Sequence, residues 1–237
     1  MTGQSYDWVV TLKTRWCLLP KQTFFNLPED KRQAIIDIAV EEFANNDYKS
    51  ASISRIVAGA GIAKGSFYQY FEDKKELYLY LIDLGSQEKA KFLEAHPPPK
   101  PKMGTFAYLR WLFSVGVRFE LSNSQLAKVS YRAYYDDRPF FDEAMHQAEE
   151  QASTFARQLL LQGMANGDLR ADMDVESAVF LFNLIILELG KYILARLDID
   201  PNELDEKGAM LFESDEAKTI FDSFLDILEN GMGNRTG

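Results

Sequence analysis

Cysteine and histidine are scarce in this chain of 237 residues, which contains one cysteine and two histidines. Cys17 has no partner for an internal disulfide, which fits a reducing compartment such as the cytoplasm. A zinc set or a catalytic triad needs several such side chains, and this sequence offers no credible combination. We therefore expect no metal, no cofactor and no enzymatic activity.

Long hydrophobic runs and signal features are also missing. No apolar run approaches the roughly 20 residues that a membrane-spanning helix needs. The segment 1–21 lacks the basic cluster, apolar block and small-residue cleavage site of a secretory signal. No alternating polar and apolar pattern of useful length predicts a β-strand. The sequence therefore predicts an all-α protein of the cytoplasm, with no membrane partner.

Positive charge is sparse overall, and a net charge of −10 at first sight argues against nucleic-acid binding. The excess is unevenly distributed, because residues 21–76 contain eight Lys/Arg and nine Asp/Glu. From residue 77 onward there are 16 basic and 26 acidic residues. A nearly neutral amino-terminal part can thus approach phosphate, while the acidic remainder faces water or another partner.

The first clear helical period begins at Pro28, a residue that suits the first position of a helix. The apolar side chains then recur at i, i+3, i+4 and i+7, as in a stripe that faces a core: Ile36, Ala39, Val40 and Phe43. This helix is expected to end near residue 46. The preceding segment 1–27 shows no sustained period and is predicted to be irregular.

Two short helices and a glycine turn are expected next. Ser52 is a good N-cap for a second helix, and Gly61 can adopt the positive φ of a tight turn. A third helix follows at about residues 63–70. Asp73 and Glu76 then resemble a capping box that starts a fourth helix, which runs to about residue 95. This pattern is typical of a helix-turn-helix that places one short helix in a DNA major groove.

The outward positions of the third helix carry side chains that suit DNA. Lys64 can reach a phosphate or a guanine edge, and Gln69 can pair with adenine. The predicted DNA-contacting set is Ser52, Lys64, Gly65, Ser66, Tyr68, Gln69, Tyr70 and Lys74. Phe67 and Phe71 are expected in the core, and partial burial of Tyr68 and Tyr70 is the alternative to DNA contact. The segment 1–27 is either flexible or a DNA-contacting arm that uses Lys13, Arg15 and Lys21.

The run from Ser52 to Leu77 resembles the DNA-binding signature of the TetR/AcrR family of bacterial transcriptional regulators. It has the N-cap, the AG-I turn, the GSFYQYF helix and the DKKEL start of the next helix. The clear similarity covers about residues 28–84. One departure is Ala63, where such proteins often carry a capping Ser or Thr, and this change costs about 1 kcal/mol. The resemblance implies a helix-turn-helix DNA-binding domain at 28–76 and a helical effector-binding and dimerisation domain at 77–237.

Four prolines at positions 97–101 mark a linker, because proline cannot continue a helix. The pattern beyond it predicts five helices, at about residues 105–121, 124–135, 139–166, 175–197 and 215–230. Most of the many aromatic residues here are expected in the core. The resemblance further implies a cavity for a small hydrophobic or aromatic effector, for which the candidates are Trp111, Phe155 and Phe182.

The last two predicted helices are apolar on more than one side, and such a helix needs a second partner. Two of these helices from each of two chains would bury one another in a four-helix interface. The predicted interface residues are Phe180, Leu184, Leu187, Phe221, Phe224 and Leu228. A thick monomeric core is the alternative. The resemblance implies the homodimer, which binds a palindromic double-stranded DNA operator, most often as a repressor.

Other classes of protein explain the sequence less well. The segment GAGIAKGS is not a phosphate-binding loop, because Lys64 precedes Gly65 instead of following it. His146 with Glu143, Glu149 and Glu150 offers a metal site, but a solvated helix face is the better interpretation. A helical adaptor that binds only protein would leave the glycine turn and Lys64 without a purpose. We therefore expect a ligand-responsive transcriptional regulator.

Overall fold

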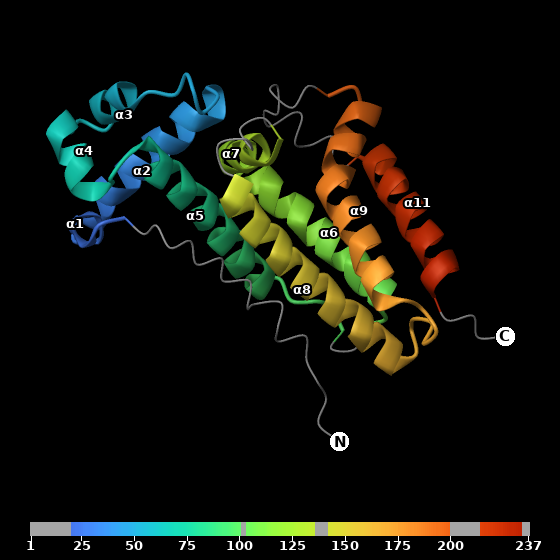
Figure 1. Ribbon diagram of the computed structural model, residues 1–237. Helices are drawn as coiled ribbons and strands as arrows, with labels where there is room; N and C mark the ends of the chain where they lie inside the picture. The colour runs from blue at the N-terminus through green and yellow to red at the C-terminus, as the bar shows by residue number, and fades with distance from the viewer. Residues whose placement is uncertain (1–19, 101–102, 136–141, 200–213, 234–237) are drawn as a thin grey trace. The chain divides into compact units, whose positions relative to one another are not determined.

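The computed structural model describes residues 20–100, 103–135, 142–199 and 214–233, and most of these residues are helical (Figure 1). The helices are α1 (Gln22–Phe25), α2 (Glu29–Asn45), α3 (Ile53–Gly59), α4 (Lys64–Tyr70), α5 (Lys74–Ala95), α6 (Thr105–Ser122), α7 (Ser124–Tyr135), α8 (Asp142–Asn166), α9 (Val175–Arg196) and α11 (Asp215–Met232). Over these ranges the only β pairing is an isolated bridge between Leu169 and Gly233. The all-α prediction is confirmed.

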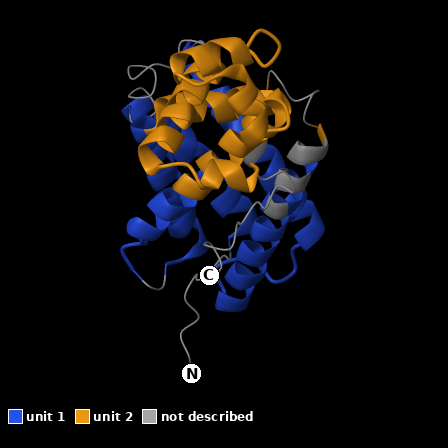
Figure 2. Cartoon of the chain, turned by 90° about the vertical axis from the view of Figure 1, so that its left-hand side faces the viewer, with its two compact units in different colours: residues 1–13, 89–122, 146–237 blue, residues 14–88, 123–145 orange. Residues whose placement is uncertain are grey.

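The chain divides into two compact units (Figure 2). Among the described residues, those of 20–88 and 123–145 form the head unit, and those of 89–122 and 146–233 form the body unit. This division differs from the predicted domain boundary at residue 76, because α7 packs with α2 and also contacts α5. The buried Tyr78 of α5 donates a hydrogen bond to the Val129 carbonyl of α7 at 3.5 Å. The head unit is therefore larger than a three-helix domain.

The core of the head unit consists of the apolar faces that the helical period predicts. Phe43, Phe67 and Phe71 are all completely buried. The Tyr78 ring lies 4.7 Å from the Phe43 ring, so α5 closes the base of this core. A seven-residue helix such as α4 has little stability alone, and packing of its Phe67 and of Phe71, the residue directly after it, holds it on the head. The core assignment of Phe67 and Phe71 is confirmed.

Helix α1 lies in the segment that the sequence predicts to be irregular. Its four residues carry the completely buried Phe24, whose ring lies 4.8 Å from the ring of Phe71. The sequence does not predict this helix, because a single turn is too short to show a helical period of apolar residues. Residues 1–19, with Lys13 and Arg15, lie outside the described residues.

The core of the body unit is aromatic and aliphatic, and it is built by α6, α8, α9 and α11. Tyr108 of α6 and Leu160 of α8 are completely buried in it. Gly167 ends α8 with a φ of 82°, and the Asp174 side chain caps α9 by accepting the Ser177 N–H at 2.8 Å. The predicted end of one helix at residue 166 and the predicted start of the next at residue 175 are confirmed.

Whether one of the described helices could span a membrane depends on its length and hydropathy. No single helix among them is long and apolar enough to cross a membrane. The segments 175–185 and 188–196 of α9 are long and apolar enough only when they are taken together, and they are bent by 42° from one another.

Gly163 of α8 lies where two other side chains come close to its backbone, and this packing gives a prediction for stability. A Cβ atom there would lie 2.5 Å from Thr105 Oγ1 and 2.8 Å from Leu169 Cδ1. We expect Gly163→Ala to lower the free energy of unfolding by about 1–2 kcal/mol, as overpacked cores do. Gly231→Ala is the matched control, because nothing lies within 4 Å of its Cβ position in α11. Urea denaturation measures both, and equal values for the two variants would contradict the packing argument.

Candidate nucleic-acid interface

Helices α3 and α4 form a helix-turn-helix with a glycine at the turn. Ser52 caps α3 by accepting the Arg55 N–H at 3.4 Å. Gly61 has a φ of 64°, the left-handed conformation that a side chain disfavours, and the Ile62 N–H then donates to the Val57 carbonyl at 3.0 Å. The predicted cap and turn are confirmed. Ala63 precedes α4 without a side-chain cap, as its chemistry requires.

The exposed face of α4 carries most of the predicted DNA-contacting residues. Lys64, Gly65 and Gln69 are exposed, and Ser66 is half-buried. Tyr68 is 45% exposed, with its ring edge-on to the buried Phe67 at 5.3 Å. Lys64 Nζ lies 3.4 Å from Ser54 Oγ on α3. These residues leave a polar face with one cation on a helix whose other face is buried.

Tyr70 is largely buried, unlike its neighbours on α4, and its contact with DNA stays a prediction. The residue is 7% exposed, and the ring lies 6.1 Å from that of Phe24. Helix α1 thus covers the position that a bare helix-turn-helix would leave open. The alternative of burial, raised for both tyrosines, holds for Tyr70 and not for Tyr68.

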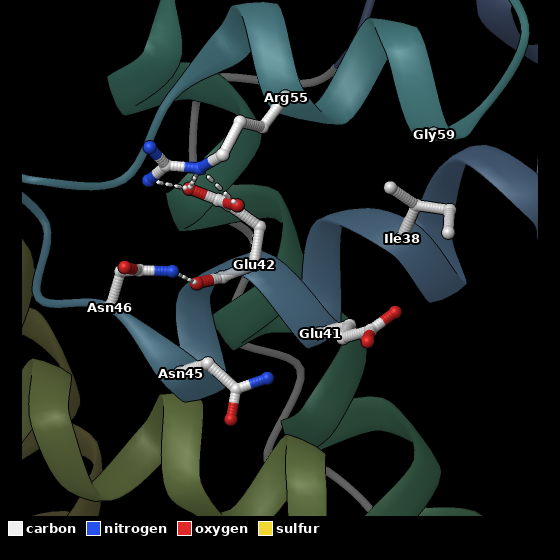
Figure 3. A pocket seen from close by; sticks show the side chains of 7 residues that line it. All are labelled: Ile38, Glu41, Glu42, Asn45, Asn46, Arg55 and Gly59. Carbon is white, nitrogen blue, oxygen red and sulfur yellow. Dashed lines mark hydrogen bonds and ion pairs between the residues drawn. The ribbon is translucent and has the colours of Figure 1, made fainter.

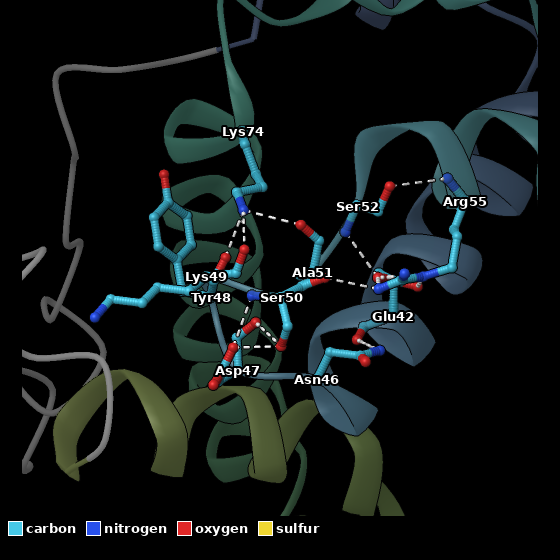
Figure 4. A network of polar contacts seen from close by, with 10 residues as sticks. All are labelled: Glu42, Asn46, Asp47, Tyr48, Lys49, Ser50, Ala51, Ser52, Arg55 and Lys74. Carbon is cyan, nitrogen blue, oxygen red and sulfur yellow. Dashed lines mark hydrogen bonds and ion pairs between the residues drawn. The ribbon is translucent and has the colours of Figure 1, made fainter.

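Lys74 has a structural role that the sequence does not show. Its ammonium donates to the carbonyls of Tyr48 at 2.5 Å, Lys49 at 3.2 Å and Ala51 at 2.9 Å (Figure 4). It also lies 4.6 Å from the centre of the Tyr48 ring, within range of a cation–π interaction. An ammonium has three N–H donors, and the loop before α3 uses all three. Contact of Lys74 with DNA stays a prediction, and it requires one of these bonds to break.

Glu42 of α2 organises the start of α3, a role that is not apparent from the sequence alone. Its carboxylate accepts the Ser52 N–H at 2.8 Å and both Nε and Nη2 of Arg55, at 3.0 and 2.5 Å (Figure 4). Arg55 Nη2 also donates to the Ser50 carbonyl at 2.8 Å. One buried carboxylate therefore ties α2 to the N-cap and the first turn of α3. An acidic residue at an otherwise core-facing helix position was the available signal.

The hydrogen bonds and charges around Glu42 lower the pKa of its carboxyl. Burial alone raises the pKa of the carboxyl, but the hydrogen bonds from the Arg55 side chain and the Ser52 N–H, with the charges of Arg55 and Lys74, outweigh burial and lower it below 4.5. Glu42 is therefore ionised in the folded head at neutral pH. The ion pair is partly buried, because Arg55 remains about half exposed.

A hollow of about 240 Å³ lies between α2 and α3, beside this ion pair (Figure 3). It is lined by Ile38, Glu41, Glu42, Asn45, Asn46, Arg55 and Gly59. The two helices approach closely at one end, where a Cβ on Gly59 would lie 2.9 Å from Ile38 Cγ2. None of these lining residues is aromatic, so the hollow differs from the aromatic cavity that is expected for an effector.

The three effector candidates meet in one core cluster of the body unit. Phe182 is buried there, and the half-buried Trp111 and Phe155 pack against the same cluster. The Trp111 ring lies 5.2 Å from that of the buried Tyr108. The structure thus brings α6, α8 and α9 together around aromatic rings. The part that these residues play toward an effector stays a prediction.

The predicted dimer residues divide between an exposed and a packed group. Phe180 is 63% exposed and Leu184 is also exposed, both on α9. On α11, Phe221 stacks on Phe113 at 3.6 Å, while Phe224 and Leu228 pack partly against the body core. The side chain of Leu187 lies outside those described. Further exposed apolar residues on the same two helices are Leu181, Tyr192 and Ile227.

The alternative metal site finds no support among the described side chains. His146 Nδ1 lies 3.2 Å from Glu149 Oε2, three residues along the exposed face of α8. Within the ranges that the structure describes, no three His, Cys, Asp or Glu side chains converge on one point. The side chain of Glu143 is not among them.

A helix-turn-helix with a polar α4 face, carried by an all-helical chain, defines a DNA-binding regulator of transcription. Residues 35–81 match the family described as bacterial regulatory proteins, tetR family, and residues 103–233 match the tetracyclin repressor-like C-terminal domain. The chain belongs to the TetR family. The regulators of this family are transcription factors, so the chain is not an enzyme.

Individual relatives agree with this assignment. A TetR family transcriptional regulator from Chloroflexus aurantiacus is 46% identical in sequence, with a TM-score of 0.71 over 92% of this chain and 100% of that one. The fatty acid metabolism regulator protein of Bacillus subtilis is 39% identical over 64 residues, 27% of this chain and 31% of that protein. The transcriptional repressor AcnR of Corynebacterium glutamicum is 24% identical over 63% of this chain and 74% of its own.

One solved neighbour was crystallised with a bound ligand. The regulator FadR from Bacillus subtilis, in complex with stearoyl-CoA, has a TM-score of 0.57 and 22% identity over 76% of this chain and 96% of that one. At this identity the likeness concerns the fold alone.

Proposed function

We propose that this protein is a repressor that binds a palindromic operator as a homodimer in the cytoplasm and leaves the DNA when a small hydrophobic or aromatic effector binds. The observation that carries the proposal is the division of α4 into a buried and an exposed face. Phe67 faces the core, whereas Lys64, Tyr68 and Gln69 remain available to DNA. Lysine, phenol and carboxamide groups supply the phosphate and base-edge contacts of a major-groove helix.

The exposed apolar residues of α9 and α11 support the homodimer. Phe180, Leu184 and Ile227 are large apolar side chains left in water by a single chain. Phe180 and Leu184 are four residues apart on α9, so they share one helix face. A second copy of the same face would bury them and make the interface two-fold symmetric. Two recognition helices related in this way suit a palindrome.

The aromatic cluster of the body unit supports an apolar effector. Its residues Trp111 and Phe155 are half-buried and lie on different helices, so small shifts of α6 or α8 can open space between them. The name of the Corynebacterium repressor and the stearoyl-CoA bound to FadR favour repression and an apolar ligand for this chain too. Release of DNA by the effector then requires only that the two ligands prefer different conformations.

Operator binding tests the proposal directly. We expect nanomolar, salt-sensitive binding to duplex DNA that flanks the protein's own gene. Lys64→Ala should weaken binding roughly tenfold and reduce the slope of log affinity against log salt by about 2, because the dimer loses one cation at the DNA from each protomer. Tyr68→Ala should weaken binding without that change of slope. Fluorescence anisotropy at several salt concentrations gives both values.

The matched control is Lys218→Ala, which removes an exposed cation from α11 in the body unit. It should leave both the affinity and the slope unchanged. Binding of the wild type no tighter than to random duplex DNA would overturn the proposed function.

A further inference from the structure

Helix α1 supplies the hydrogen-bond donors for the carboxyl end of the recognition helix α4. The last four carbonyls of a helix have no partners within it and need donors from outside. The Phe67 carbonyl accepts from the Phe71 N–H at 2.9 Å. The next three carbonyls accept donors from α1 and the residue before it: Tyr68 from Lys21 Nζ at 2.9 Å, Gln69 from Thr23 Oγ1, and Tyr70 from the Lys21 N–H at 2.8 Å.

These contacts give each of the last carbonyls of α4 a hydrogen-bond donor, and they place a positive charge near the carboxyl end of the helix. Lys21 brings an ammonium to the carboxyl end of the helix, where the helix dipole favours positive charge. At the other end of α4, Ala63 contributes no side-chain cap. Side-chain bonds to the backbone of this short helix are therefore concentrated at its carboxyl end.

Helix α1 is itself anchored on both sides. The buried Phe24 ring lies 4.8 Å from Phe71 and 5.6 Å from Tyr80. Arg32 of α2 donates to the Phe25 carbonyl at 3.2 Å. A segment held in this way can fix the orientation of α4 on the head, since its donors cannot follow α4 if that helix tilts.

We infer that Lys21 and Thr23 are positioning residues for operator recognition, which hold α4 at the angle where its exposed face meets the bases. The inference rests on the proposed function for its DNA readout. It differs from the expectation that Lys21 belongs to a DNA-contacting arm, since the Lys21 ammonium donates a hydrogen bond to the Tyr68 carbonyl. Neither side chain needs to touch DNA to affect recognition.

Thr23→Val is the sharpest test, because it removes one hydroxyl and changes neither charge nor shape greatly. We expect it to weaken binding to the duplex that flanks the gene roughly three- to tenfold, the effect of one lost hydrogen bond. Binding to random duplex should be unchanged, so the ratio of specific to non-specific affinity falls. Thr23→Ser keeps the hydroxyl and should restore the wild-type ratio.

Lys21→Met separates positioning from phosphate contact. Loss of a positioning lysine lowers the specific affinity by a similar factor and leaves the salt slope unchanged, whereas loss of a phosphate-contacting lysine from both protomers lowers the slope by about 2. Lys218→Met serves as the control for loss of an exposed cation. A reduced slope for Lys21→Met alone would overturn the inference for Lys21.

Hydrogen exchange in the full-length protein without DNA gives an independent readout. In Thr23→Val and Lys21→Met, the amides of α4 should exchange several-fold faster, while those of α2 keep the wild-type rate. Unchanged α4 exchange together with unchanged specific affinity overturns the inference. If the wild type shows no preference for the tested duplex, the proposed function fails, and faster α4 exchange still decides whether α1 holds the helix.

Discussion

The double substitution Phe180→Glu with Leu184→Glu is expected to convert the protein from a dimer to a monomer. Both side chains are exposed on one face of α9, and a carboxylate buried in an apolar interface costs several kcal/mol. A monomer engages one half-site at a time, so the operator affinity should fall at least a hundredfold through loss of bivalence. Light scattering coupled to size exclusion reports the mass, which should fall from twice 27.1 kDa to this value.

Leu161→Glu is the matched control for that change. Leu161 is also an exposed leucine of the body unit, but it lies on α8, outside the proposed interface. It should remain a dimer with wild-type operator affinity. A double variant that stays dimeric would exclude this face of α9 from the interface.

Removal of the Glu42 carboxylate is expected to have the largest effect on the stability of the head. Glu42→Ala leaves the Ser52 N–H and Arg55 without their acceptor, and loss of hydrogen bonds to a charged group costs roughly 2–3 kcal/mol. The cost stays below that of a fully buried pair, because water reaches Arg55. Glu41→Ala, an exposed neighbour on α2, should change the free energy of unfolding by less than about 0.5 kcal/mol.

The same carboxylate predicts a dependence on pH. The folded head lowers the pKa of Glu42 below 4.5, so its contribution is complete above this value and is lost as the pH falls through the lowered pKa. The difference in unfolding free energy between wild type and Glu42→Gln should therefore shrink as the pH falls below 4.5. Urea denaturation from pH 7 to pH 3 measures it, and a difference that grows on acidification would contradict the assignment.

Much of the local architecture follows from short-range chemistry and was predictable. Ser52 caps α3 and Asp174 caps α9, because a short side-chain oxygen reaches an N–H three residues on. Gly61 adopts positive φ because glycine lacks the Cβ that would clash. Helical periodicity likewise placed most helices within a few residues, since each apolar stripe records which side of a helix is buried.

The same local logic failed where a distant segment decides the environment of a residue. Tyr70 sits at an outward position of α4 by sequence, yet Phe24 covers it from a helix 46 residues earlier. Lys74 resembles a free cation at a helix start, but three carbonyls of the loop before α3 surround its ammonium. Periodicity cannot reveal such contacts, because it describes one helix and not its neighbours.

The helix-turn-helix and the family resemblance were therefore present in the order of residues 52–77, where caps, turn and spacing depend on near neighbours. Which side chains of α4 remain available to DNA depends on how α1, α2 and α5 pack around it. Lys21, Thr23 and Glu42 gain their roles only when segments from 10 to 47 residues apart come within hydrogen-bond distance. Hydrogen bonds act over about 3 Å in space, whatever the separation along the chain.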